Sequence, residues 1–357
     1  MKKIILSGLF AVTIFVACKK SGVDETPMED FNAKKDVGIT DFVNKVAIAG
    51  YTELKIKADV LNNSIITLNA TTTDANLTAS KNAWRDMRST WERCEGYLFG
   101  PVEDDNYDPE TDTWPVDYVA MNALLADNTH ALDVTDINSL QLSLKGYHPI
   151  EYMLWGQNGN KTAAQFTARQ KLYMVSLSAH LQQKATALKN SWLPTGGNYS
   201  AAVLNAGKGS TLFVKKQDAY ISIANGMSDI CGEVGDGKMK EPFDAMDPNI
   251  VESPFSGNSI PDFQKNITGA YNVYLGKFNE DGAGLEDLVK MKNSALDAEL
   301  QSKFNAAISS FNSITVPFEK AIFTQRVQCQ NTMNAINALA TVIDTKLKPF
   351  IIQNITD

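Results

Sequence analysis

The sequence of 357 residues predicts an all-α protein built from two four-helix-bundle-like domains packed side by side. Beyond Val37, apolar residues recur at intervals of three and four, which is the period of an amphipathic helix. Alternating β-branched runs bounded by hairpin turns are lacking in the sequence, so strands are not expected. Loops rich in Gly, Pro and Asn separate the periodic segments. The hydrophobic content of 44% can fill real cores and excludes wholesale disorder.

The first segment of the chain has the features of an export signal. Lys2 and Lys3 precede a short apolar run over residues 4–17, which is too short for a bilayer span of about 20 residues. A basic start, an apolar stretch and a small residue at its end indicate a secretory signal peptide. Cys18 follows Ala17 directly, as in the lipobox of bacterial lipoproteins, so we expect lipid attachment at Cys18. An ordinary signal peptide with a cysteine nearby by chance is the alternative.

These features give four predicted regions. Residues 1–17 are the signal peptide, 18–36 a flexible lipid-anchored tether, 37–196 an N-terminal helical bundle, and 197–357 a C-terminal helical bundle. The expected location is the bacterial cell envelope, with the protein attached to a membrane on the periplasmic side or as an outer-membrane lipoprotein. A net charge of −8 argues against a nucleic-acid partner, and we expect a monomer. Three further cysteines are expected to be buried and reduced, namely Cys94, Cys231 and Cys329.

The helices follow from caps, periodicity and terminators. Thr40 is suited to cap a first helix that continues past Val60. A second helix carries Trp84 and Trp91 on one apolar stripe and ends at residues 100–101, a Gly-Pro pair. The remaining helices are predicted at about residues 117–126, 162–192, 210–230, 260–275, 293–314 and 327–351.

Charged residues border the apolar stripe of the second helix. Arg88, Glu92 and Glu95 lie one position beyond that stripe, where carboxylates lose hydration and need a cation, an arginine or a metal. Arg88 and Glu92 are four residues apart, so a structural ion pair is the simplest role for Arg88. Glu95 has no basic partner on its own face and is the better candidate for a metal ligand.

A second group lies between Gly146 and Gly156. Pro149 fits the first turn of a helix, which places His148 at the helix entry and Glu151 one turn further on the same side. An imidazole and a carboxylate so placed can hold one metal ion or share a proton. The alternative is a histidine that caps the helix and is hydrogen-bonded to the glutamate.

Acidic residues crowd the loop that follows the second helix. Their spacing does not fit a calcium-binding EF-hand loop, and most of them are expected to be solvated. Asp117 begins the next helix and has either a capping or a functional role. The loop acids are Glu103, Asp104, Asp105, Asp108, Glu110 and Asp112.

The second half contains a long irregular loop over residues 241–259, and loops of this kind are often functional. Just upstream, residues 232–238 match Gly-x4-Gly-Lys, but Met239 stands where a phosphate-binding loop has Ser or Thr. The segment also follows a predicted helix rather than a strand, so we reject a phosphate loop.

Taken together, these residues resemble the imelysin-like family. Gly146, His148 and Glu151 match its Gly-x-His-x-x-Glu motif, although Thr90 and Arg93 stand where tyrosine and threonine are common in the family. Further matches follow in the family's order: Trp91, Glu92, Glu95, Trp114, Asp117, Glu252, Ser253, Phe255, Ser256, Asn258, Asp262, Asn266 and Tyr274.

The resemblance implies two similar four-helix bundles with a site at their interface. It also implies a link to bacterial iron uptake, and thus an iron-transport system as a partner, although the family was formerly grouped with metallopeptidases. By the matched positions, the implied metal ligands are His148, Glu151, Glu95, Glu92 and Asp117. The other implied binding residues are Gly146, Arg88, Trp114, Glu252, Ser253, Ser256 and Asn258.

Two functions remain open at this point. One imidazole with several carboxylates suits iron or another hard cation, so a metal-binding protein is the leading hypothesis. The alternative is a zinc metallopeptidase that uses the His-x-x-Glu motif, but His-Glu-x-x-His is absent from the sequence and His180 fits a packed core. A purely structural polar network is the third interpretation.

Overall fold

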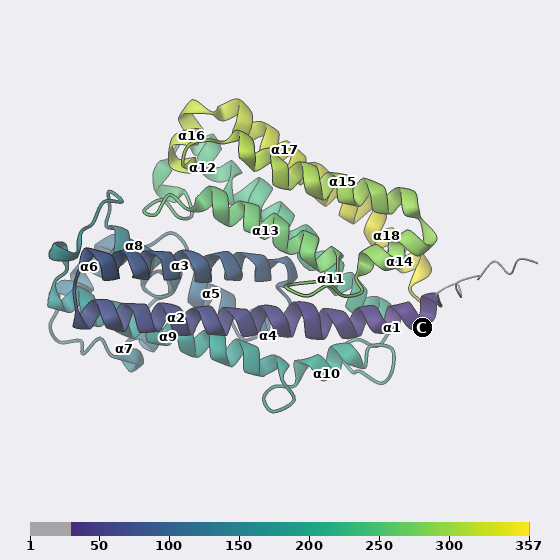
Figure 1. Ribbon diagram of the computed structural model, residues 1–357, viewed down its shortest axis with the longest axis horizontal. Coiled ribbons are helices and arrows are strands. Elements are labelled where there is room, and N and C mark those ends of the chain that lie inside the picture. Colours follow the sequence, from purple (N-terminus) through teal and green to yellow (C-terminus); the bar gives the residue numbers. More distant parts are fainter. Residues whose placement is uncertain (1–29, 357) are drawn as a thin grey trace, which may run out of the picture. The chain divides into compact units, whose positions relative to one another are not determined.

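The computed structural model describes residues 30–356, and every regular element within them is a helix (Figure 1). The prediction of an all-α protein is confirmed. The predicted signal peptide, Cys18 and most of the predicted tether lie outside the described residues. None of the described helices combines the length and apolar character required to cross a bilayer.

The first group of helices along the chain includes the longest ones. In order these are α1 (Phe31–Asp41), the π-helix η1 (Phe42–Ala47), α2 (Ile48–Ala70), α3 (Asp74–Cys94), η2 (Glu95–Tyr97), α4 (Pro101–Asp104), α5 (Tyr107–Asp112), α6 (Tyr118–Ala126), α7 (Val134–Ser139), η3 (Leu142–Leu144), α8 (Tyr147–Trp155), η4 (Ala163–Gln165) and α9 (Ala168–Trp192).

The remaining helices follow after a turn at residues 193–198. They are α10 (Tyr199–Leu204), α11 (Lys216–Gly232), the π-helix η5 (Glu233–Lys238), α12 (Lys240–Ala245), η6 (Pro248–Ile250), α13 (Ser259–Tyr274), α14 (Leu285–Lys292), α15 (Ser294–Ser310), η7 (Phe311–Ser313), α16 (Phe318–Thr324), α17 (Arg326–Val342), the π-helix η8 (Ile343–Leu347) and α18 (Lys348–Asn354).

Two predicted boundaries at the start of the chain are wrong. Thr40 does not cap a helix, because α1 already begins at Phe31 and the Thr40 hydroxyl donates back to the Asp36 carbonyl at 2.8 Å. Residues 31–36 therefore belong to a helix rather than to the tether. Tertiary contacts stabilise this early start, since Lys35 is buried and the Tyr220 hydroxyl donates to its carbonyl at 2.8 Å.

The helices pack in two groups that lie against each other. In Figure 1, α2 runs beside both α3 and α9, while α11, α13, α15 and α17 lie on the other side of α3. The contact between α3 and α13 joins the groups, and the described residues from Phe31 onward form one compact unit. The division into two domains near residue 197 stays a prediction.

Glycines permit the close contact between α3 and α13. A Cβ atom on Gly269 of α13 would lie 2.4 Å from the carbonyl oxygen of Arg93. A Cβ atom on Gly96, just past α3, would lie 2.7 Å from the backbone nitrogen of Ala270. Because backbone atoms cannot give way like a flexible side chain, only glycine fits both positions. The polar residues of α3 and α13 can therefore contact each other directly.

Candidate metal centre

Arg88 is the central cation of a buried polar cluster between α3 and its neighbours. Its side chain is fully buried and contacts Glu92 Oε1 at 2.5 Å, which agrees with the predicted pair one helical turn apart. Its Nη2 also lies 2.7 Å from Glu252 Oε1, and its Nε lies 3.7 Å from Asp262 Oδ2. Nη1 pairs with Asp112 Oδ1. One guanidinium thus compensates carboxylates from four segments of the chain.

His148 lies at the start of α8, as the sequence predicts, and is fully buried. Its Nδ1 lies 3.3 Å from Glu151 Oε2, the carboxylate one turn further on. Its Nε2 lies 3.1 Å from Asp112 Oδ1 but makes no hydrogen bond of good geometry. Gly146 permits this arrangement because a Cβ atom there would lie 2.1 Å from the carbonyl oxygen of Thr111, the residue before Asp112.

The loop before α13 brings the second half of the chain to His148 and Glu151. Ser256 donates to Glu151 Oε1 from its backbone nitrogen at 2.8 Å and from its hydroxyl at 2.6 Å. Ser253 Oγ and Asn258 Nδ2 donate to the two oxygens of Asp262 at 2.8 and 2.6 Å. The serine and asparagine side chains therefore hold carboxylates in place rather than pointing into solvent.

A second cation lies beside Glu95. Asn266 Nδ2 donates to Glu92 Oε2 at 2.6 Å and to Glu95 Oε2 at 2.5 Å. Lys238 Nζ, from the π-helix η5, lies 3.0 Å from Glu95 Oε2 and 3.0 Å from Glu252 Oε1. Glu95 thus has a basic partner from a distant segment, which the helix face alone could not reveal.

Burial and the crowding of like charges shift the pKa values of the carboxyl groups in this cluster. Burial raises the pKa of Glu92 to about 8, although Arg88 and Lys238 oppose the shift. Burial likewise raises the pKa of Glu95 well above its usual range, and the neighbouring Glu92 raises it further. Burial opposes ionisation of Asp112 too, but Arg88 and then His148 outweigh it and hold that pKa far below normal. The cluster contains more acids than its cations neutralise.

The residues present fit a metal ion. Ligand atoms of Asp112, His148 and Glu252 lie within 4.8 Å of one another, as do those of Glu92, Glu95 and Asp112, so Asp112 belongs to both sets. Glu252 Oε2 is buried and has no hydrogen-bond partner, and the nearest acceptor to His148 Nε2 is Asp112 Oδ1 at 3.1 Å. Buried polar atoms are rarely left unpaired, so the free oxygen of Glu252 can accept a further positive partner.

A pocket of about 250 Å³ leads to these side chains. Trp114 forms part of its wall and meets the His148 ring edge-on, with ring centroids 5.0 Å apart. Lys238 supplies positive charge to the lining, and the carboxylates are Glu95, Asp108, Asp112, Glu233, Glu241 and Glu252. Such a lining attracts cations from solution.

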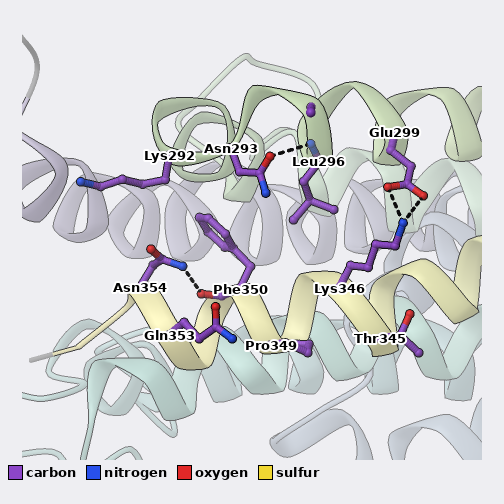
Figure 2. A pocket seen from close by; sticks show the side chains of 11 residues that line it. Lys292, Asn293, Leu296, Glu299, Thr345, Lys346, Pro349, Phe350, Gln353 and Asn354 are labelled. Carbon is purple, nitrogen blue, oxygen red and sulfur yellow. Dashed lines mark hydrogen bonds and ion pairs between the residues drawn. The ribbon is translucent and has the colours of Figure 1, made fainter.

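A larger pocket, of about 560 Å³, lies between the C-terminal helices and has a different character (Figure 2). Its prominent charged pair, Glu299 and Lys346, is partly exposed, with Nζ 2.6 Å from Oε1. Asn293 and Asn354 bond to the backbone of their own helices. Glu299 already pairs with Lys346, and the third charged residue of the lining is the cation Lys292, so the chemistry of this pocket is less suited to a metal ion.

The structure does not bring Asp117 into the cluster. Asp117 is exposed and caps α6, where its Oδ1 accepts from the backbone nitrogen of Ala120 at 2.9 Å. Of the two roles considered for this residue, the structure shows the capping role. His180, the histidine expected in a packed core, is fully buried, and burial lowers its pKa to about 4.

Replacement of this cap has a defined expected result. We expect Asp117→Ala to lower the free energy of unfolding by about 1 kcal/mol, because one backbone donor of α6 loses its acceptor. Urea unfolding followed by circular dichroism measures the change. Asp117→Asn keeps the acceptor and should retain stability near that of the wild type. If Asp117→Ala lost metal binding, Asp117 would have a role in the site in addition to capping α6, which would contradict our interpretation.

Asp112 and Lys238 are the central residues that sequence reasoning missed. Asp112 was one of the loop acids of which most were expected to be solvated, but its side chain is 4% exposed because α5 ends against α8. The signal for Lys238 was the glycine-rich pattern over residues 232–238, which was rejected as a phosphate loop. The structure agrees with that rejection, since these residues continue α11 as a π-helix.

The pKa shifts also predict how stability depends on pH. Burial opposes charge on His148, but Asp112 and Glu151 outweigh it and raise its pKa to about 9. The pKa values of both His148 and Glu92 are higher in the folded than in the unfolded chain, so the folded protein binds more protons between pH 6.5 and 8. Its stability must therefore fall as the pH rises through this window.

Thermal unfolding of the metal-free protein in EDTA at pH 6.5, 7.2 and 8 should show this decrease as a Tm lower by several degrees. Glu92→Gln removes one of the two contributions and should flatten the dependence. A Tm that rises between pH 6.5 and 8 would contradict the raised pKa values of His148 and Glu92 in the folded protein.

Together, the fold and this cluster define an all-helical protein with a buried centre rich in carboxylates and containing one histidine. Residues 47–345 match the family profile of imelysin, also designated peptidase M75. The chain belongs to the imelysin family, as the sequence motifs indicated.

The relatives agree with this assignment. The chain is 28% identical over 311 residues to iron-regulated protein A of Synechococcus elongatus, covering 86% of this chain and 83% of that protein. A crystal structure described as an iron-regulated protein A precursor from Parabacteroides distasonis has a TM-score of 0.81 and 23% identity, and covers 93% of this chain and 97% of that one.

An imelysin-like protein from Psychrobacter arcticum has a TM-score of 0.74 at 13% identity, covering 90% of this chain and 96% of that one. At these identities the two solved structures show that the fold is shared.

Proposed function

We propose that this protein binds a hard metal cation, iron in the first place, at the cluster of Asp112, His148 and Glu252. The observation that carries the proposal is the convergence of Asp112, His148 and Glu252, whose ligand atoms lie within 4.8 Å of one another, with Glu252 Oε2 buried and without a hydrogen-bond partner. An ion that binds the His148 imidazole releases its proton, because histidine is a metal ligand in its neutral form. One imidazole nitrogen with carboxylate oxygens is a donor set that suits iron better than a soft, thiolate-seeking metal. The name of the Synechococcus relative, iron-regulated protein A, also favours iron.

We further propose that the protein acts as a monomer in the bacterial cell envelope, held to a membrane by lipid on Cys18, where it serves an iron-transport system. The sequence around Cys18 and the motifs of the family support this proposal. Globomycin-sensitive processing of the chain and incorporation of labelled palmitate, both lost in Cys18→Ser, would test the lipid attachment.

The metal proposal is tested by titrating the protein from residue 30 onward with ferric citrate and measuring bound iron by mass spectrometry after desalting. We expect His148→Ala and Glu252→Gln to weaken iron binding at least as much as the loss of an outer-shell partner of a metal ligand does, which is about 10- to 100-fold. His130→Ala is the matched control, because His130 is exposed and lies outside the cluster.

Iron binding that is equal in His148→Ala and the wild type would contradict the proposal. Zinc-dependent cleavage of a peptide library, lost in the same variants, would favour the metallopeptidase alternative instead. Circular dichroism of each variant shows whether a loss of binding reflects a loss of fold.

A further inference from the structure

Lys238 occupies the position from which a metal ion would contact the acids of the pocket. Its Nζ lies 3.0 Å from both Glu95 Oε2 and Glu252 Oε1 and 4.0 Å from Glu92 Oε2. All three acids belong to the candidate ligand sets: Glu252 to one set, and Glu92 and Glu95 to the other. Its side chain is 13% exposed, so the ammonium is held inside the protein.

An ion and the ammonium cannot both use these oxygens. Hard cations bind carboxylate oxygens at about 2.0 to 2.6 Å, whereas the ammonium already spans Glu95 and Glu252 with hydrogen-bond distances. A metal ion bound to either carboxylate would lie within a few ångströms of Nζ, where two positive charges repel strongly in a buried setting. Entry of the ion therefore requires Lys238 to leave.

The π-helix η5 places the Lys238 ammonium beside these acids and also allows it to move outward. In the π-helix η5, residues five apart share a face, so Glu233 and Lys238 meet, with Oε1 and Nζ 3.2 Å apart. The Glu233 side chain is 48% exposed and lines the same pocket, so it marks the outer end of the path. Lysine has a long flexible stem, so its ammonium can move outward while still pairing with Glu233.

We propose that Lys238 is a tethered competitor cation, which neutralises the acids in the metal-free protein and is displaced outward when a metal ion binds. This inference rests on the proposed function and specifies how the same site is controlled. Binding is then an exchange of cations. Ions that bind the bare acids only weakly do not outcompete the tethered ammonium and stay out, even when they are abundant.

Lysine acetylation read by mass spectrometry tests the displacement directly. The probe ion is Tb³⁺, a hard trivalent cation whose luminescence is sensitised by a nearby indole such as that of Trp114. We expect saturating Tb³⁺ to increase the acetylation rate of Lys238 at least tenfold. Lys240 is the matched control, because it is exposed and pairs with Asp244, so its rate should not change. Unchanged or slower acetylation of Lys238 with Tb³⁺ bound would overturn the proposal.

Affinity gives a second, independent measurement. Lys238→Met should tighten Tb³⁺ binding at least tenfold, while Lys240→Met leaves it unchanged; equal binding by Lys238→Met and the wild type would count against competition. Binding by Lys238→Met alone would mean that the ammonium excludes the ion instead of exchanging with it, which would contradict both the displacement and metal binding by the wild type. If neither protein binds Tb³⁺ or ferric citrate, the proposed function itself fails and this inference fails with it. Binding without exposure of Lys238 overturns the inference alone.

Discussion

Arg88→Met is expected to lower the free energy of unfolding by about 3–5 kcal/mol, the usual cost of removing one partner from a buried ion-pair network. Arg88 is fully buried and faces Asp112, Glu92, Glu252 and Asp262, so its loss leaves several negative charges without their main counter-ion. Because the whole stability of a domain is about 5–15 kcal/mol, this is a large share of it. Urea unfolding followed by far-ultraviolet circular dichroism measures the effect.

Arg93→Met is the matched control on the same helix. Arg93 pairs with Glu53 at 2.8 Å, but both side chains are partly exposed, at 17% and 23%, so its loss should cost about 1 kcal/mol. Equal costs for the two variants would mean that the acids around Arg88 take up protons when it is removed and need no guanidinium. A hard cation should rescue Arg88→Met in part, because it replaces the missing positive charge.

Gly146→Ala has the second large expected effect. Gly146 has a φ of 95°, and a Cβ atom there would lie 2.1 Å from the Thr111 carbonyl oxygen, a backbone atom that cannot rotate away. We expect a loss of about 3 kcal/mol, from left-handed backbone strain together with steric overlap. The separation of α5 and α8 must increase, so the contact between Asp112 and His148 should loosen.

Nuclear magnetic resonance of the His148 ring provides the readout specific to the site. Its pKa should fall from about 9 toward the ordinary value when Asp112 moves away. Gly232→Ala is the control, because Gly232 is helical and a Cβ atom there meets no atom within 4 Å, so stability should stay equal or rise by up to about 1 kcal/mol. A Gly146→Ala protein as stable as Gly232→Ala would refute the role of this close approach.

Local pattern was sufficient to predict which residues of the cluster share one face of a helix. The i, i+3 and i, i+4 spacings place Arg88, Glu92 and Glu95 on one face of the second helix, and His148 and Glu151 on another. Such spacings depend only on the geometry of a single helix, so they survive any tertiary arrangement. The burial of these residues also follows from the apolar stripe beside them.

Residues outside regular periodicity were misjudged. Asp112 and Asp117 belong to the same acidic stretch, and no local signal separates the buried side chain at the end of α5 from the exposed cap of α6. The glycine-rich pattern around Lys238 did not reveal its role, because its partner Glu95 is more than 100 positions away along the chain and Lys238 reaches it from the π-helix η5. Thr40 was wrong as a cap because contacts to Tyr220 extend the helix upstream of it.

By itself, then, the sequence determined that the protein is helical, that it belongs among imelysin-like chains, and which helix faces carry acids and the imidazole, since all of these depend on short-range geometry or on motif order. Only the tertiary structure decided which acids share a cation. Charge compensation depends on distance in space, and the contact of α3 with α13, η5 and the end of α5 joins segments that the chain order keeps apart.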